Sequence, residues 1–569
     1  MFNFDKIKKI IDREKFYILK KIFFSNFLYS FVEFFSILSL PIFVSLLIDK
    51  NYLVEKYNFK IFFGSYENDL IIIISVLIVL IFLIKNIFYI FLIYIQSKFI
   101  EELKILVSEK VFNGYILGSY YNHLNKSPSL LTRDTTYSVQ SFGFYIFHLI
   151  NLFRELISIT LLVLLVFFIK PLIIIIAGIF FSLIVLSFHK KLKKVLNIKA
   201  SENEKLNSLF IKDVFNTFLS IKDIKILKKE SEIIEKFKTK VKKFEKNLFF
   251  FQVLEKIPKL TLELLSIIFL LIICLVLFRV SEDQTEFFTT LSVFLVAIVR
   301  LLPGFTSLIS SLNYLKIFKP GLINLYNQSE KLNSPSKNYQ SDFKGFYVRK
   351  KNIKLVVVED LSFGYFKKKN LLQNINFEII EGKMNCITGE TGSGKTTLFN
   401  LMLGLLEPRS GNIYYRGKNI KSDISNWHKA ISLVSQEPYL FDDTIINNIT
   451  FNALENNIDN KRLVKAIEIS ELSETIKKLE KGLHTKVSSQ SINLSGGEKQ
   501  RIALARALYK DSDILFLDEF TNAIDEEKEK KILSNLKKLV KKTFIIISHK
   551  KSTIGQCNKI WKLKNGKIN

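Results

Sequence analysis

Cysteine is nearly absent from this chain, which has three cysteines among 569 residues. They lie at positions 274, 386 and 557, and no two of them share the C-x-x-C spacing of a metal or redox motif. The sequence therefore predicts neither a disulfide framework nor a zinc site. We expect each thiol to be a packed or incidental side chain.

Acidic residues are also under-represented, because 53 of them stand against 82 lysines and arginines and leave a formal net charge of +29. Nucleic-acid binding is one explanation for such a charge. The lysines, however, concentrate between long hydrophobic runs, as the positive-inside rule describes for membrane proteins. Part of the excess also reflects a general preference for Lys, Asn, Ile and Phe. We therefore expect a membrane protein with no nucleic-acid partner.

Hydrophobic residues make up 49% of the chain and concentrate in its first half. A chain of 569 residues is too long for one core and should hold two or more domains. Its apolar runs approach the ~20 residues that a helix needs to cross a bilayer. They predict six membrane spans, at residues 22–48, 70–97, 144–169, 171–189, 261–280 and 287–318.

Two of the links between these spans, residues 98–143 and 190–260, are long and polar, and the second is rich in lysine. Long basic loops stay in the cytoplasm, so both chain ends should lie on that side. We expect the two links to be helices that project from the membrane. Residues 1–21 should form an amphipathic elbow helix rather than a cleaved signal peptide, because they lack a small-residue cleavage site.

The segment 389–396 fits the P-loop pattern G-x-x-x-x-G-K-[ST]. A short strand at 384–388 precedes it and a helix that begins near Thr397 follows it, which argues against a chance match. Lys395 can reach the β- and γ-phosphates of a nucleotide, and the Thr396 hydroxyl can bind Mg²⁺. The predicted phosphate cradle comprises Gly389, Glu390, Thr391, Gly392, Ser393, Gly394, Lys395, Thr396 and Thr397.

The chain changes character after the last predicted span. Residues 326–350 are polar and read as a linker, and short β-type runs then alternate with helical stretches, as in an α/β nucleotide-binding domain. The predicted fold is an α-helical transmembrane bundle of six spans followed by an α/β P-loop domain. Its predicted parts are 1–325 in the membrane domain, the linker at 326–350, and the nucleotide-binding domain at 351–569.

A second acidic motif follows the apolar run 514–517. Asp518 and Glu519 would stand at the end of a buried strand, beside the phosphate site. There Asp518 can hold Mg²⁺ and Glu519 can polarise the attacking water. The alternative, a solvated strand end, loses weight because the P-loop is present in the same domain.

A second anion-binding helix start occurs at Ser495, Gly496 and Gly497. A single nucleotide held by the P-loop does not need a second cradle from the same chain. These residues are therefore predicted to serve a nucleotide that is bound to a partner subunit.

These motifs resemble those of ATP-binding-cassette (ABC) proteins. Ser495 to Glu498 resemble the LSGGQ signature, with Glu where Gln is commonest. The resemblance implies that Tyr365 stacks on adenine, Gln436 contacts Mg²⁺ and senses the membrane domain, Asp525 belongs to the D-loop, and His549 contacts the γ-phosphate. It also implies ATP and Mg²⁺ as cofactors.

Together with the six spans, the motifs resemble an exporter-type ABC half-transporter. The resemblance implies a homodimer in which each ATP lies between the P-loop of one chain and the signature of the other. Coupling helices are expected near residues 117–130 and 209–225. Three departures from the family pattern leave the coupling between the two nucleotide-binding domains open: the absence of glycine in 485–491, Phe520 where Ala is common, and Lys550-Lys551 where Arg-Leu is usual.

Charged residues inside membrane spans are costly and commonly functional. Lys85, Lys259 and Arg300 are the candidate substrate contacts, and such cations suit an anionic headgroup such as a pyrophosphate. The alternative is that Lys259 reaches the membrane surface and that Arg154 and Glu155 pair with their neighbours. Glu33 and Glu263 are further charges within the predicted spans.

The spans also resemble those of bacterial flippases for lipid-linked oligosaccharides. Arg300 with Pro303, Pro258 with Lys259, and Lys85 carry this resemblance, although lysine replaces arginine at two positions. It implies a flippase for lipid-linked glycans in a bacterial inner membrane, with a short external helix at 49–69 and a cytoplasmic nucleotide-binding domain. The alternative is a general exporter of lipids or hydrophobic drugs, and a non-transporting ATPase of the superfamily would lack the spans.

Overall fold

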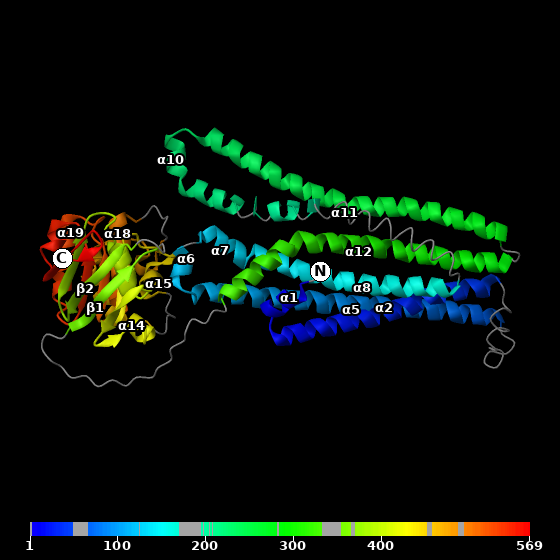
Figure 1. The fold of residues 1–569 in the computed structure, drawn as a ribbon, viewed down its shortest axis with the longest axis horizontal. Coiled ribbons are helices and arrows are strands. Elements are labelled where there is room, and N and C mark those ends of the chain that lie inside the picture. Colours follow the sequence, from blue (N-terminus) through cyan, green and yellow to red (C-terminus); the bar gives the residue numbers. More distant parts are fainter. Residues whose placement is uncertain are drawn as a thin grey trace. The chain divides into compact units, whose positions relative to one another are not determined.

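The computed structural model describes residues 3–48, 67–124, 126–169, 195–196, 198–203, 205–206, 209–280, 284–332, 354–365, 370–451, 458–487 and 494–568. This described chain divides into two compact units, one built from long helices and one from mixed helices and strands (Figure 1).

Five helices of the first unit dominate it: α2 (Arg13–Ile48), α5 (Glu67–Ile116), α8 (Tyr137–Ile169), α11 (Glu230–Val280) and α12 (Gln284–Leu332). The shorter helices are α1 (Phe4–Ile10), α6 (Tyr120–Leu124), α7 (Pro128–Thr135) and α10 (Ile221–Ile226). Of the described residues, five stretches are long and apolar enough to cross a membrane: Arg13–Leu40, Ile71–Ile116, Pro128–Leu164, Glu230–Val276 and Thr290–Ser329.

These five stretches cover five of the six predicted spans. The fourth, 171–189, lies outside the described residues, as do residues 49–66 of the predicted external helix. Helix α5 exposes many apolar side chains, including Ile72, Leu77 and Ile90, as suits contact with lipid, and it buries Leu92 and Phe99. Helix α11 has 51 residues and is therefore about 75 Å long, more than twice the ~30 Å of a bilayer core.

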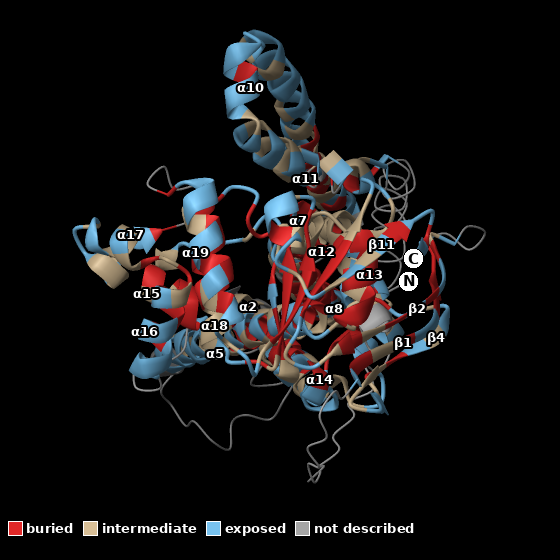
Figure 2. Cartoon of the chain, turned by 90° about the vertical axis from the view of Figure 1, so that its left-hand side faces the viewer, coloured by how far each residue is buried: buried red, intermediate tan, exposed pale blue. Residues whose placement is uncertain are grey.

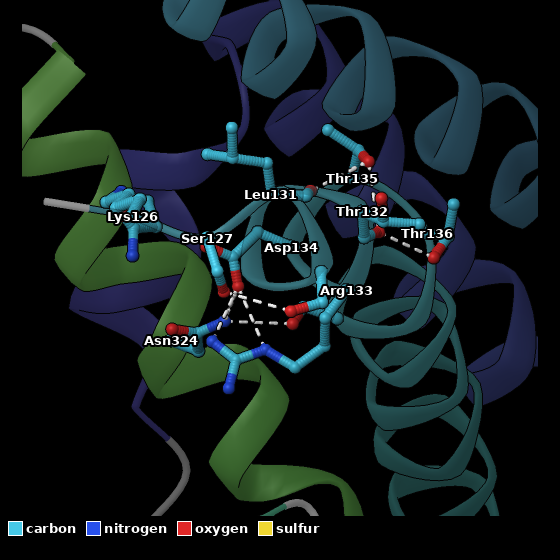
Figure 3. A network of polar contacts seen from close by, with 12 residues as sticks. Lys126, Ser127, Leu131, Thr132, Arg133, Asp134, Thr135, Thr136 and Asn324 are labelled. Carbon is cyan, nitrogen blue, oxygen red and sulfur yellow. Dashed lines mark hydrogen bonds and ion pairs between the residues drawn. The ribbon is translucent and has the colours of Figure 1, made fainter. Parts of the chain in front are cut away.

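A buried polar network holds four helices of this unit together around Asp134 of α7 (Figure 3). Tyr115 of α5 donates to one carboxylate oxygen at 2.7 Å, and Arg133 donates to the other at 2.7 and 3.1 Å. Asn324 of α12 donates to Asp134 at 2.6 Å and to Ser138 of α8 at 2.9 Å. Asp134 is only 1% exposed, so its charge is compensated by these donors and not by water.

Lysine 126, between α6 and α7, extends this network. Its ammonium donates to Gln328 of α12 at 2.7 Å and lies over the ring of Tyr115. The predicted first coupling region, 117–130, thus contains α6 and the start of α7, and its side chains contact α5 and α12. The second, 209–225, falls on a helical stretch that includes the start of α10.

Among its described residues, the second unit contains two larger sheets and a third of two strands. Its six-stranded sheet has the order β12-β11-β3-β10-β9-β6, in which β11, β3, β10, β9 and β6 are parallel. These strands are β3 (Met384–Gly389), β6 (Ile431–Val434), β9 (Ile514–Asp518), β10 (Thr543–Ile547), β11 (Lys559–Lys564) and β12 (Lys567–Ile568). The central strands β9 and β10 are continuous apolar runs and are buried along their whole length. Figure 2 shows buried strands in red between helices with exposed outer faces.

The four-stranded antiparallel sheet has the order β2-β1-β4-β5, formed by β1 (Lys354–Phe363), β2 (Leu372–Ile380), β4 (Ser410–Tyr415) and β5 (Lys418–Asn419). A small ladder pairs β7 (Asp443–Thr444) with β8 (Lys486–Val487). The helices are α13 (Lys395–Met402), α14 (Ile424–Ala430), α15 (Ile445–Thr450), α16 (Asn460–Ile469), α17 (Ser473–Lys477), α18 (Gly496–Tyr509), α19 (Glu526–Lys537) and α20 (Lys551–Ile554).

The parallel strands determine where chemistry can occur, because their carboxyl ends lie at one edge of the sheet. Strand β3 ends at Gly389, β9 at Asp518 and β10 at Ile547, while β6 ends two residues before Gln436. The predicted P-loop, acidic motif, glutamine and histidine therefore share this edge. Helix α12, which belongs to the first unit, continues to Leu332 and so includes the first residues of the predicted linker, whose later residues lie outside the described ranges.

Replacing Asp134 should destabilise the helical unit. Asp134→Ala removes the acceptor for Tyr115, Arg133 and Asn324 and leaves a largely buried guanidinium uncompensated, which should cost about 3–5 kcal/mol. The melting temperature of the detergent-solubilised chain measures this loss. Asp12→Ala is the matched control, because its exposed pair with Lys110 should contribute less than about 1 kcal/mol. Equal melting temperatures for the two variants would contradict the prediction.

Candidate nucleotide site

The P-loop turns between β3 and α13, and its glycines are required by geometry. Gly392 and Gly394 have φ values of 83° and 102°, in the left-handed region that disfavours other residues. A Cβ on Gly394 would also come within 3.0 Å of the Leu372 side chain. The loop is therefore held in a conformation that leads directly into the N-terminus of α13, where backbone N–H groups are free to bind phosphate.

Two side chains supply further donors in this loop. Lys395 is buried, and its ammonium donates to the carbonyl oxygens of Gly389 and Glu390 at 2.9 Å each. Burial lowers the pKa of Lys395, while Glu519 and Asp518 oppose that shift. Ser393 Oγ is a buried hydroxyl that has no hydrogen-bond partner among the described residues. A triphosphate would supply acceptors for both groups, so the loop fits that ligand.

The acidic motif lies at the end of β9. Asp518 is buried, and this burial together with the neighbouring Glu519 raises its pKa to about 6, while Lys395 acts in the opposite direction. A cation at this position would favour the charged carboxylate, so Asp518 fits a Mg²⁺ ligand. Thr396, another predicted Mg²⁺ ligand, is exposed at the first turn of α13.

Glu519 is the centre of a polar cluster at the sheet edge. Gln436 and Asn522 donate to one of its carboxylate oxygens at 2.9 and 2.7 Å, and His549 Nε2 lies 3.4 Å from the other. The residue also has a left-handed backbone, with φ of 46°, and such strain concentrates at functional sites. The structure thus brings together Glu519, Gln436 and His549, as expected from the sequence.

Asn522 begins the segment that resembles the D-loop, but its contact with Glu519 was not predicted from the sequence. The only available signal was its place three residues after Glu519, where a tight turn returns the chain toward the carboxylate. Gln500 was also missed. It donates to the Gln436 carbonyl at 3.3 Å and accepts from the Ala523 N–H at 3.1 Å, so it joins α18 to both neighbouring loops.

Tyr365 lies near the start of α13. Its hydroxyl is 3.2 Å from Thr397 Oγ1, and its ring packs edge-on against Phe363. The side chain remains 40% exposed, which leaves a ring face beside the phosphate loop for an adenine.

The signature residues form the N-terminus of α18. Ser495 Oγ accepts from the Glu498 N–H at 3.3 Å, and the Glu498 carboxylate accepts from the Ser495 N–H at 2.7 Å. Because Glu and Gln both close such a capping box, the Glu498 departure preserves the local fold. A Cβ on Gly497 would lie 2.6 Å from the Ala523 carbonyl oxygen, and one on Gly496 would lie 3.2 Å from the Ala523 Cβ.

The signature and the P-loop are not joined within one chain. Across the described residues, no hydrogen bond or ion pair links 495–498 with 389–397. Asp525 instead caps α19 by accepting from the Lys528 N–H. The chain thus holds one phosphate cradle and, apart from it, a second anion-binding helix start.

Two of the departures from the family pattern have structural explanations. Phe520 is 1% exposed and fills the core behind β9. Lys550 donates to the Thr521 carbonyl at 2.7 Å and to the buried Glu529 at 2.9 Å, which ties the segment after His549 to the turn after Glu519. The glycine-poor segment 485–491 falls mostly outside the described residues.

The predicted substrate residues occupy different environments. Lys85 is half-buried on α5 with its ammonium over Phe82, and Lys259 is exposed on α11. Arg300 of α12 pairs with Glu33 of α2 at 2.6 Å and lies 3.7 Å from Glu155 of α8. Arg154 pairs with Glu155 at 2.9 Å, so that part of the alternative interpretation is correct.

A family model described as ABC transporter matches residues 372–522. The chain is 40% identical over 214 residues to the mitochondrial iron-sulfur clusters transporter ATM1 of Kluyveromyces lactis, covering 37% of this chain and 29% of that protein. It is 38% identical over 216 residues to the ATP-dependent lipid A-core flippase of Vibrio parahaemolyticus, covering 37% of each. The match spans about a third of these relatives' length.

The second unit is therefore an ATP-binding domain of the ABC class. The structure of a bacterial Atm1-family ABC exporter with ATP bound superimposes with a TM-score of 0.78, at 20% identity, over 97% of this chain and 94% of that one. This similarity establishes the fold: the whole chain has the architecture of an ABC exporter, with an N-terminal helical membrane domain and a C-terminal nucleotide-binding domain.

Glu519→Gln should abolish hydrolysis without preventing nucleotide binding. The amide keeps the shape of the side chain but cannot polarise water, and loss of such a base costs about 10²–10⁴-fold in rate. Phosphate release and binding of a fluorescent ATP analogue by the full chain measure the two properties. Glu526→Gln, at the start of α19, is the control and should retain the wild-type rate. Full activity of Glu519→Gln would exclude this residue as the base.

Lys550→Met should weaken the nucleotide-binding domain. Glu529 would keep its hydrogen bonds from Ser552 and Thr553 but lose its cation, at a cost of about 1.5–3 kcal/mol. The hydrogen bonds from these three side chains hold the pKa of Glu529 low against the effect of burial, so their stabilisation is present at neutral pH and is lost as the pH falls. Thermal unfolding at pH 7 and at pH 4 checks both statements. Lys551→Met, at an exposed neighbour, should behave like wild type.

Proposed function

We propose that this chain is an ATP-driven exporter that works as a dimer and moves an amphipathic, anionic substrate across a bacterial inner membrane. One observation carries the proposal: a set of ATP-hydrolysis residues and a helical membrane domain with buried charges occur in a single chain that has the ABC exporter fold. The expected arrangement places the nucleotide-binding domain in the cytoplasm.

ATP binding and hydrolysis are assigned to the residues at the sheet edge. The P-loop residues 389–397 would bind the phosphates and Tyr365 the adenine, while Thr396, Gln436 and Asp518 would hold Mg²⁺. Glu519 would accept a proton from water. His549 Nε2 lies 3.4 Å from the Glu519 carboxylate, close enough to orient that carboxylate. Binding and hydrolysis of ATP would drive the change between the inward-facing and outward-facing states.

The second copy is proposed because, among the described residues, no hydrogen bond or ion pair links the signature to the P-loop of the same chain. Ser495, Gly496, Gly497 and Glu498 would cap the nucleotide held by the P-loop of a second chain, and Asp525 would lie at the same contact. An identical chain is the simplest partner, since every motif is present here. Closure of the two nucleotide-binding domains would then require ATP, and a chain without its signature would retain ATP binding but lose closure.

The substrate is proposed to be a lipid or a similar amphiphile. The lipid A-core flippases among the relatives support this broad class, whereas the iron-sulfur clusters transporter shows that relatives of similar identity carry different cargo. The lipid A-core flippases support a general lipid exporter better than the narrower assignment to lipid-linked oligosaccharides, and the iron-sulfur clusters transporter supports neither. The latter stays a candidate because of Lys85, Lys259 and Arg300.

Stimulation of ATPase activity by substrate tests this proposal. We expect the full chain in lipid nanodiscs to be stimulated by farnesyl pyrophosphate and by a polyprenyl-pyrophosphate glycan, and not by farnesol or a neutral drug. Lys85→Ala should lose the stimulation and keep the basal rate, because it removes a half-buried cation without leaving a partner unpaired. Lys98→Ala, an exposed lysine of the same helix, is the matched control.

Each other outcome of this experiment has a consequence. Equal stimulation by neutral drugs would support the drug exporter, and stimulation only by the glycan would support the narrower flippase. Unchanged stimulation of Lys85→Ala would exclude Lys85 as a substrate contact. Failure of every amphiphile to affect the rate would contradict the proposed substrate class.

A further inference from the structure

The predicted substrate cation Arg300 is already occupied by a carboxylate of its own chain. Arg300 donates through Nε at 2.7 Å and pairs through Nη2 at 2.6 Å with the same oxygen of Glu33. The other Glu33 oxygen accepts from Ser158 at 2.7 Å. Both oxygens of this buried carboxylate are thus satisfied by α12 and α8, while the residue itself belongs to α2.

The second nearby carboxylate does not hold Arg300 in the same way. Glu155 accepts from Arg154 at 2.9 Å through one oxygen, and its other oxygen has no hydrogen-bond partner among the described residues. That oxygen lies 3.7 Å from Arg300, beyond hydrogen-bond distance. Arg154 in turn donates to Tyr89 at 3.0 Å. Glu33 is therefore the carboxylate that occupies Arg300.

The exposure of the two partners differs. The Arg300 side chain is 24% exposed, whereas that of Glu33 is 5% exposed. The Arg300 side chain is thus the more accessible of the two, and one edge of its guanidinium is already used by Glu33. Because arginine binds carboxylates and phosphates through the same planar donors, an incoming anion would compete with Glu33 for that edge.

Lys85 supplies the charge that makes such a competition feasible. It interacts electrostatically with both Glu33 and Arg300. Arg154, Arg300 and Lys85 stand against Glu33 and Glu155, so the cluster carries one excess positive charge. A displaced Glu33 would keep Lys85 as a nearby cation and Ser158 as a donor, so it would not be left as an isolated charge.

We propose that Glu33 determines the specificity of this site by occupying Arg300 until an anionic group of the substrate displaces it. Displacement breaks the only ion pair that joins α2 to α12 among the described residues. Entry of the substrate thereby removes a contact that holds α2 against α12. Because Glu33 competes for Arg300, the affinity of the site for anions is lower than Arg300 and Arg154 alone would give. The inference rests on the proposed function, since it assumes that the substrate reaches Arg300.

Binding of farnesyl pyrophosphate to the full chain in nanodiscs, with farnesol as the uncharged probe, tests this inference. Glu33→Gln keeps the shape of the side chain and removes the competing charge, so affinity for the pyrophosphate should rise about tenfold or more. Affinity for farnesol should not change. Arg300→Gln should lose pyrophosphate binding, and adding Glu33→Gln to it should restore none.

Two further variants separate a specific effect from a general one. Glu33→Asp keeps the charge but shortens the side chain, so it should give a smaller gain and guards against misfolding of the amide variant. Glu263→Gln removes an exposed carboxylate of α11 and should leave binding unchanged.

The outcomes distinguish this inference from the proposed function. If wild type binds the pyrophosphate and Glu33→Gln binds it equally or more weakly, only the inference is overturned. If neither wild type nor Glu33→Gln binds it, the anionic substrate class and the inference both fall. A gain that persists in the Arg300→Gln background would also overturn the inference, because the charge would then act without Arg300.

Discussion

The parallel register of β3, β9, β10 and β6 is the constraint on which the nucleotide site depends. Pairing of Ile547 with Asp518 and with Ile387 places the ends of three strands side by side. Glu519 then accepts its hydrogen bonds from Gln436 and Asn522, residues that come from loops at the same edge. A slip of one residue would turn the side chains of a strand to the other face of the sheet and displace the loop that follows that strand.

A comparable constraint acts in the helical unit, where the low dielectric of a membrane makes every unpaired charge costly. The structure meets it by pairing: Arg300 with Glu33, Arg154 with Glu155, and Asp134 with three donors. The pair of Arg300 with Glu33 joins α12 to α2, and Asp134 of α7 accepts from residues of α5 and α12, so these two contacts also determine which helices pack together. Arg154 and Glu155, in contrast, are neighbours on α8. Apolar contacts alone would specify this arrangement poorly, since lipid tails compete equally for the same side chains.

Motifs with fixed spacing allowed the nucleotide site to be predicted from the sequence. The P-loop, Asp518 and Glu519 follow short strands whose type and order are visible in the apolar runs, so their meeting at one edge follows from sheet geometry. Gln500 and Asn522 could not be predicted in this way, because an amide contributes no pattern of its own. Their roles depend on the turn at 519–525, which is a property of the folded chain.

The membrane unit was less accessible to such reasoning. Hydrophobic runs identified five of the described spans, yet the charges within them gave no information on pairing. Arg154 and Glu155 are adjacent, so their pairing could be considered in advance, whereas 267 residues separate Glu33 from Arg300. Long-range pairing of this kind depends on helix packing, for which the sequence of a single chain offers no periodic signal.

The two prolines inside helix α12 affect how this helix can bend. It carries Arg300 in its first half and Asn324 near its C-terminal end, and both Pro303 and Pro320 lie between them within one continuous helix. Each proline removes a backbone hydrogen bond and softens the helix against bending at that turn. A displacement of Arg300 would therefore be transmitted to Asn324 through a helix that bends at its two prolines. The segments on either side would keep their own contacts.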